Sequence, residues 1–288
     1  MDANPVLPAA PPVLPSPPPA PSPVNRRRWW VHLLLITGYI VVVGLLAHQR
    51  YGKPMQAPAL THTVKGLLSV CASNLFIFAV VVGLAVFASR ASRDDLLLRW
   101  RKGFWPVPLG IGYSIALRFA LLVILATAGA MLVLSRAMTP ESFEQFSQAH
   151  RPNLEVMVDA EALRGNPVYF WLVLTLVSFV VAGLREELWR AAFLAGLRSL
   201  WPRHFGSRAG GIAAVGIAAV VFGCAHLVMG PVAVLLTGLL GFGLGLIMVF
   251  HRSIWPAVIA HGMFDATTLA LVPWLTEKLR FLPQAIGS

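Results

Sequence analysis

The chain has 288 residues, of which 57% are hydrophobic and only 12% are charged, and its mean hydropathy is +0.72. This composition excludes an ordinary soluble domain. The net charge of +11 does not indicate nucleic-acid binding either, because the basic residues lie beside the ends of apolar runs and form no single stripe. Both cysteines, Cys71 and Cys224, lie inside apolar runs, so neither a disulfide framework nor a cysteine metal cluster is indicated.

Residues 1–25 form a proline-rich segment with ten prolines and one charge, Asp2. The segment lacks the basic start and the apolar core of a secretory signal. We expect a disordered, polyproline-like and solvated tail. A docking role for this tail is the alternative.

Seven apolar runs have the length, about 18 residues or more, that a helix needs to cross the hydrocarbon core of a membrane. We therefore predict an all-α fold, a polytopic transmembrane helical bundle of about seven helices with the lipid bilayer as its partner. Twelve lysines and arginines flank the runs on the N-terminal side of the membrane and eight on the other, which predicts a cytoplasmic N-terminus and an external C-terminus. The runs lie at 29–48, 66–88, 107–135, 167–184 with a helical continuation to about 200, 209–229, 231–250 and 254–273.

Residues 26–166 hold the first three runs and their loops, for which we predict a scaffolding role. Arg118, in the third run, could pair with a buried carboxylate or snorkel to the membrane surface, and the basic residues nearby favour snorkelling. The acidic connection at 136–166 could form a short surface helix or be mobile. Residues 274–288 follow the last run as a C-terminal tail.

Three of the twelve acidic residues lie inside apolar runs: Glu186, Glu187 and Asp265. A charged side chain in mid-bilayer costs about 2.5–3.5 kcal/mol, so each should have a partner. Arg185, Arg190, His226 and His261 are the candidates. Each of these residues alone could be purely structural. Their concentration in the last four runs indicates one shared polar site, which we expect in a four-helix catalytic core at residues 167–273.

Helical spacing suggests the contacts within this site, because residues three and four apart share a helix face. Arg190 is four residues from Glu186 and three from Glu187, and could hold both carboxylates. Asp265 is four residues from His261 and could fix the tautomer of its ring. Phe222 and His226 repeat the spacing, and the small residues between them would allow another helix to pack closely.

At these residues the sequence resembles the CAAX prenyl protease and bacteriocin-processing family, called CPBP or Abi, of intramembrane endopeptidases. The second family motif, Phe-x-x-x-His, stands intact at Phe222 to His226. The third, His-x-x-x-Asn or Asp, stands at His261 to Asp265. The order and separation of the motifs also fit.

The first family motif, Glu-Glu-x-x-x-Arg, is irregular here. In one register Glu186 and Glu187 are its two glutamates, and Ala191 replaces the arginine. In the other, Arg190 is the arginine, Glu186 is the second glutamate, and Arg185 replaces the first. Glu186 belongs to the site in both registers.

The resemblance implies an enzyme that hydrolyses a membrane-associated peptide or protein, in the inner membrane of a bacterium. It implies that a glutamate activates water, that histidines stabilise the oxyanion, and that the second glutamate and the arginine support them. Glu186, His226 and His261 could also bind zinc, but no His-Glu-x-x-His motif is present, and we expect no cofactor. A catalytically silent scaffold or immunity protein and, less favoured, a small transporter are the alternatives. The expected site comprises Glu186, Glu187, Arg190, His226, His261 and Asp265.

Overall fold

The computed structural model describes residues 25–51, 61–100, 103–152 and 157–281. Apart from Asn25, the predicted N-terminal tail lies outside these ranges. All regular structure in them is helical, as predicted for an all-α membrane protein. The elements are α1 (Arg26–Tyr51), α2 (Val64–Ser89), α3 (Pro106–Leu134), α4 (Pro140–Ala149), α5 (Ala160–Gly165), α6 (Pro167–Leu172), the π-helix η2 (Val173–Leu184), α7 (Arg185–Leu200), α8 (Pro202–Phe205), α9 (Arg208–Cys224), the 3-10 helix η3 (Leu227–Met229), α10 (Pro231–His251) and α11 (Trp255–Phe281).

Five helical segments among the described residues are long and apolar enough to cross a membrane: α1, α2, α3, the continuous α6–η2–α7 segment and α10. The other two predicted runs are also helical. Helix α9 has only 17 residues because it ends at Cys224, whereas the sequence predicted a helix to 229. Helix α11 carries Asp265 in its interior and continues past Pro273 to Phe281, so the first part of the predicted C-terminal tail is helical.

The outer surface of the bundle is apolar. Large hydrophobic side chains such as Phe76, Phe87, Phe119 and Leu134 are exposed. A soluble protein would bury most of these side chains, but lipid is as apolar as they are. This surface and the long apolar helices make the protein an integral membrane protein.

Most residues of helix α7 are buried among neighbouring helices. One face packs into a core with α1, α2 and α9, and Ala191 packs into a second core with α10 and α11. The indole of Trp189 donates a hydrogen bond of 3.0 Å to the Ile36 carbonyl of α1. Buried His32 also joins α1 to its neighbours, with its ring nitrogens 2.9 Å from the Ala192 carbonyl and 3.0 Å from the Ser89 hydroxyl. The sequence analysis did not single out His32.

Two close helix contacts involve glycines whose missing side chains leave room for a neighbouring backbone. A Cβ atom on Gly183, at the end of η2, would lie 2.9 Å from the Val258 carbonyl oxygen of α11. A Cβ atom on Gly223 of α9 would lie 2.5 Å from the Val234 carbonyl oxygen of α10. The close packing that we predicted after Phe222 therefore occurs at Gly223. The Gly183 contact brings the start of α7 against α11.

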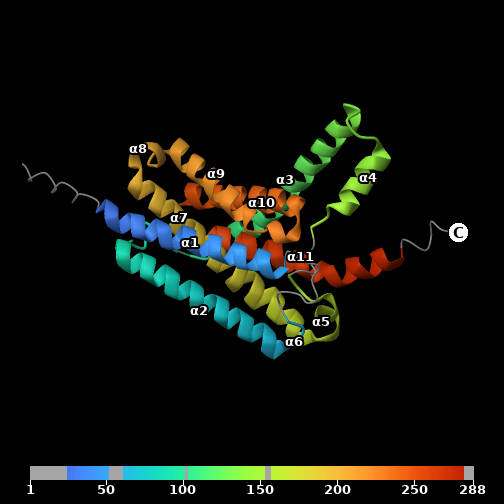
Figure 1. Cartoon of the computed structure of the whole chain (residues 1–288), viewed down its shortest axis with the longest axis horizontal. Coiled ribbons are helices and arrows are strands. Elements are labelled where there is room, and N and C mark those ends of the chain that lie inside the picture. Colours follow the sequence, from blue (N-terminus) through green and yellow to red (C-terminus); the bar gives the residue numbers. More distant parts are fainter. Residues whose placement is uncertain (1–24, 52–60, 101–102, 153–156, 282–288) are drawn as a thin grey trace, which may run out of the picture.

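The connection between α3 and α6 contains two short helices in its described part. Thr139 and Ser142 form a capping box that begins α4, and Asp159 caps α5. The short-helix alternative for this connection is therefore correct. Helix α4 and the end of α3 project away from the rest of the bundle (Figure 1).

Candidate active site

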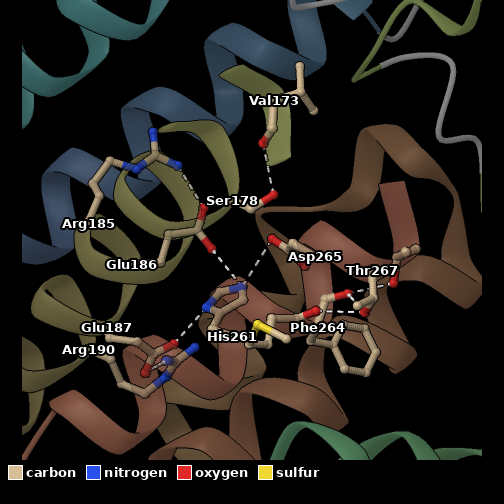
Figure 2. A network of polar contacts seen from close by, with 12 residues as sticks. Val173, Ser178, Arg185, Glu186, Glu187, Arg190, His261, Phe264, Asp265 and Thr267 are labelled. Atoms are coloured by element: carbon tan, nitrogen blue, oxygen red, sulfur yellow. Dashed lines mark hydrogen bonds and ion pairs between the residues drawn. The ribbon is translucent and has the colours of Figure 1, made fainter. Parts of the chain in front are cut away.

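The predicted polar residues of α7 and α11 meet where the start of α7 packs against α11 (Figure 2). Glu186 and Glu187 lie in the first turn of α7, directly after the π-helix. His261 and Asp265 lie one turn apart on α11. His261 faces both glutamates.

Glu187 is the fully buried centre of this network. Its Oε1 lies 2.8 Å from Nδ1 of His261, and its Oε2 accepts a hydrogen bond from Nη1 of Arg190, which is also fully buried. The Arg190 guanidinium lies over the ring of Phe222, 4.7 Å from its centroid. A carboxylate can only accept a hydrogen bond, so Nδ1 of His261 carries the proton. Glu187 thereby fixes the tautomer and the orientation of this ring.

Asp265, which we predicted to orient His261, makes a longer contact with the opposite edge of the ring. Oδ2 of Asp265 lies 3.6 Å from Nε2 of the ring, which is too far for a hydrogen bond. The spacing of four residues does bring the two side chains together on α11, but the other edge of the ring faces α7. There Glu187 makes the shorter contact.

The prediction that Arg190 holds both glutamates fails. Arg190 binds Glu187, whereas Oε1 of Glu186 accepts a hydrogen bond of 2.7 Å from Nη2 of Arg185. Each glutamate therefore has an arginine of its own. Arg185 also interacts with the hydroxyl group of Tyr39 on α1. Tyr39 lies in an apolar run, so the sequence did not indicate this contact.

Glu186 is more accessible than its neighbour. Its side chain is 17% exposed, against 0% for Glu187. Its Oε2 lies 3.8 Å from Nε2 of His261. Asp265 approaches the same nitrogen and is 29% exposed. Nε2 of His261 therefore faces the accessible side of the site, with one carboxylate on either side.

His226 lies beside this network without bonding to it. It follows the end of α9, and its Nδ1 lies 2.8 Å from the Phe222 carbonyl oxygen. Its ring packs against Phe222 with the centroids 4.7 Å apart, and Phe222 in turn contacts the ring of His261. In the described part of the chain, His226 makes no hydrogen bond to another site side chain, but it lies within electrostatic reach of Glu186.

Arg118 does not snorkel, contrary to our prediction. Its Nη2 donates to the Phe264 carbonyl and the Thr267 hydroxyl, and lies 3.2 Å from the Thr268 hydroxyl. The guanidinium also lies over the Phe264 ring, 4.1 Å from its centroid. All of these acceptors belong to α11 and bind the guanidinium within the bundle. Arg118 thus ties α3 to α11 next to Asp265.

The zinc alternative would require Glu186, His226 and His261 to surround one ion. Among the described residues, no group of three or more histidine, cysteine, aspartate and glutamate side chains is arranged to hold a metal ion. Nδ1 of His261 donates to Glu187, which leaves Nε2 as the ring nitrogen that could bind a metal ion or a substrate.

Residues 167–267 match the model of a protein family described as type II CAAX prenyl endopeptidase, Rce1-like. The match covers about a third of the chain, and over this segment the chain is similar to that family. The matched segment runs from α6 into α11 and contains all six predicted site residues. Comparison with curated proteins and with solved structures gave no match. At the level of the family, this match supports a CAAX-type intramembrane protease.

Proposed function

We propose that this protein hydrolyses a peptide bond of a membrane-associated peptide or protein, with Glu186 as the general base. The observation that carries this proposal is the difference between the two adjacent carboxylates. Both oxygens of Glu187 already accept hydrogen bonds in a fully buried position. Glu186 has one oxygen bonded to Arg185, while the other faces the accessible side of the site. A base must reach the water from which it takes a proton, and Glu186 meets this requirement better.

The difference in exposure and bonding between the two carboxylates also favours the register in which Glu186 is the first and Glu187 the second glutamate of the family motif. In that register Ala191 occupies the arginine position, and it is buried against α10 and α11. Arg190 then supplies the supporting cation from one residue earlier, through its ion pair with Glu187. The irregular motif thus keeps a glutamate and arginine pair in the supporting role.

The two histidines are suited to binding the oxyanion that forms when water attacks. In each ring Nδ1 is held by an oxygen acceptor, the Glu187 carboxylate for His261 and the Phe222 carbonyl for His226. Nε2 is then the nitrogen that can face the substrate. It donates a hydrogen bond only when the ring is an imidazolium. The carboxylates around His261 stabilise that charge.

The reaction balances with water as the only co-substrate. Glu186 takes one proton from water while the water oxygen attacks the carbonyl carbon, and the oxyanion is stabilised by Nε2–H groups of the histidines. The proton then passes to the amide nitrogen as the C–N bond breaks. The products are a carboxylic acid and an amine. We place the protein in a bacterial inner membrane, by its resemblance to bacteriocin-processing members.

The first experiment identifies the substrate and tests the base. Membrane proteins that co-purify with a Glu186→Ala variant and not with wild type supply substrate candidates, and their cleavage is then measured with purified full-length variants. Glu186→Gln should lower the rate by about 10²–10⁴, and His226→Ala and His261→Ala by about 10²–10³. Glu187→Gln should be milder, because the amide oxygen still accepts from His261. Glu144→Gln on exposed α4 is the matched control and should cleave at the wild-type rate.

Two results would contradict this assignment in different ways. If Glu187→Gln is inactive and Glu186→Gln is not, Glu187 is the base. If wild type and both glutamine variants give the same substrate profile, the protein is a silent scaffold, the alternative that the irregular first motif favours.

A further inference from the structure

A cavity of about 260 Å³ lies at the end of the bundle where α7 ends, α9 begins and α10 ends. In Figure 1 this end is marked by α8 and by the start of α1. The candidate active site lies at the opposite end of α7. The cavity is therefore a separate feature of the molecule, and its function does not depend on the proposed protease activity.

Three arginines from three different elements line this cavity: Arg198 of α7, Arg208 of α9 and Arg252 after α10. In the ranges that the structure describes, none of them forms an ion pair with a carboxylate. Arg198 donates to the backbone carbonyls of Asp95, at 2.9 Å, and Leu194, at 3.3 Å. Arg208 lies over the Phe250 ring, 5.7 Å from its centroid. Arg198 and Arg252 are close enough to repel each other.

The nearest acidic group does not neutralise this cluster. The Asp95 carboxylate attracts Arg198, but its Oδ2 accepts hydrogen bonds of 2.8 and 2.7 Å from the backbone and the hydroxyl group of Ser92. This carboxylate, already bonded to Ser92, attracts only one of the three arginines among the described residues. The cavity therefore has an excess of positive charge that an anion would stabilise.

The remaining lining restricts the kind of anion. The first turn of α9 contains no acidic residue, so the positive end of this 17-residue helix adds to the field of the arginines. Leu97, Leu194 and Val249 make the rest of the wall largely apolar. The cavity lies where membrane-spanning helices end, which is the level of lipid headgroups. The paired N–H groups of an arginine side chain can donate two hydrogen bonds to phosphate oxygens. An apolar wall can pack against the glycerol and upper acyl region of a lipid.

We propose that this cavity binds the phosphodiester headgroup of an anionic phospholipid from the adjacent leaflet. The phosphate lies among Arg198, Arg208 and Arg252, and the glycerol end of the lipid lies against the apolar wall. A free phosphate ion offers the same charge but leaves that wall uncovered. The lipid therefore binds more tightly than the ion.

The test uses the full-length protein in detergent and three probes: phosphatidylglycerol, phosphatidylcholine and inorganic phosphate. Lipid retention is measured by native mass spectrometry, and the midpoint of thermal unfolding is measured during titration. Phosphatidylglycerol should bind saturably and raise the midpoint, and the other two probes should not. Arg208→Gln and Arg252→Gln should each weaken its binding about fivefold. Both side chains are exposed, so the fold should tolerate the changes.

Arg203→Gln is the matched control, because Arg203 is exposed on α8 at the same end but does not line the cavity. It should change binding by less than about twofold. Lysine at 208 and 252 should retain most of the affinity, which separates charge loss from misfolding. If Arg203→Gln weakened lipid binding equally, the lipid would be held by diffuse attraction to the basic surface and not by this cavity. Equal binding of phosphatidylcholine, or of inorganic phosphate, would refute an anionic lipid as the ligand.

Discussion

At the residue scale, the cost of burying an unpaired charge explains why the polar residues gather in one site. Charged groups in an apolar medium must find partners, and Glu186, Glu187, Arg190, His261 and Asp265 do lie in one network. Helical spacing shows which residues share a face. It does not show which side chain on another helix also reaches the ring, and Glu187 of α7 makes the shorter contact with His261, at Nδ1.

The buried pair of Glu187 and Arg190 leads to a prediction about stability. Arg190→Met should leave the fully buried Glu187 carboxylate without its cation and lower the free energy of unfolding by about 3–5 kcal/mol. Adding Glu187→Gln should recover most of this loss, because the amide is neutral and its oxygen still accepts from His261. Thermal unfolding of the purified variants measures both effects. If Arg190→Met alone were as stable as wild type, Glu187 would not be charged in the folded protein.

At the element scale, the apolar runs identified the helices, but hydropathy did not predict two local features. The composition of η2 does not indicate a π-helix. Within it, the hydroxyl group of Ser178 donates a hydrogen bond of 3.0 Å to the Val173 carbonyl, five residues earlier in the chain. Helix α9 ends before His226 although the sequence stays apolar, so the second family motif spans a helix end. Helix η2 packs against α11 and helix α9 packs against α10, and these contacts cannot be read from the sequence of one segment.

The contact of α9 with α10 predicts opposite effects for two glycines on the same helix. Gly223→Ala would place a Cβ atom 2.5 Å from a carbonyl oxygen of α10, whereas a Cβ atom on Gly216 would meet nothing within 4 Å. Gly223→Ala should therefore lower stability by about 1–3 kcal/mol. Gly216→Ala should be neutral or stabilise by up to about 1 kcal/mol through its better helix propensity. If both variants unfold alike, the two helices are not as close at Gly223 as the structure indicates.

At the scale of the whole molecule, the structure brings the basic segments to one end of the bundle. Trp30 of α1 packs against Trp201 after α7, with the ring centroids 5.1 Å apart. The Arg198 side chain bonds to the Asp95 carbonyl, and the Ile254 amide bonds to the Leu97 carbonyl at 2.9 Å. Contacts between segments so distant in sequence were not predictable from charge counts. Arg101 and Lys102, which belong to the same predicted side, lie outside the described residues.

This arrangement predicts the orientation of the protein, because the end of a membrane protein that is rich in lysine and arginine faces the cytoplasm. A reporter inserted after Arg252, between α10 and α11, should therefore be cytoplasmic. A reporter fused after Ser288 should lie outside, since α11 runs from that end to the opposite end of the molecule (Figure 1). Activity of paired cytoplasmic and external reporters in whole cells measures both positions. Two cytoplasmic reporters would mean that α11, which is not among the five apolar candidate spans, does not cross the membrane. A reversed result at both positions would mean that the basic end faces outward.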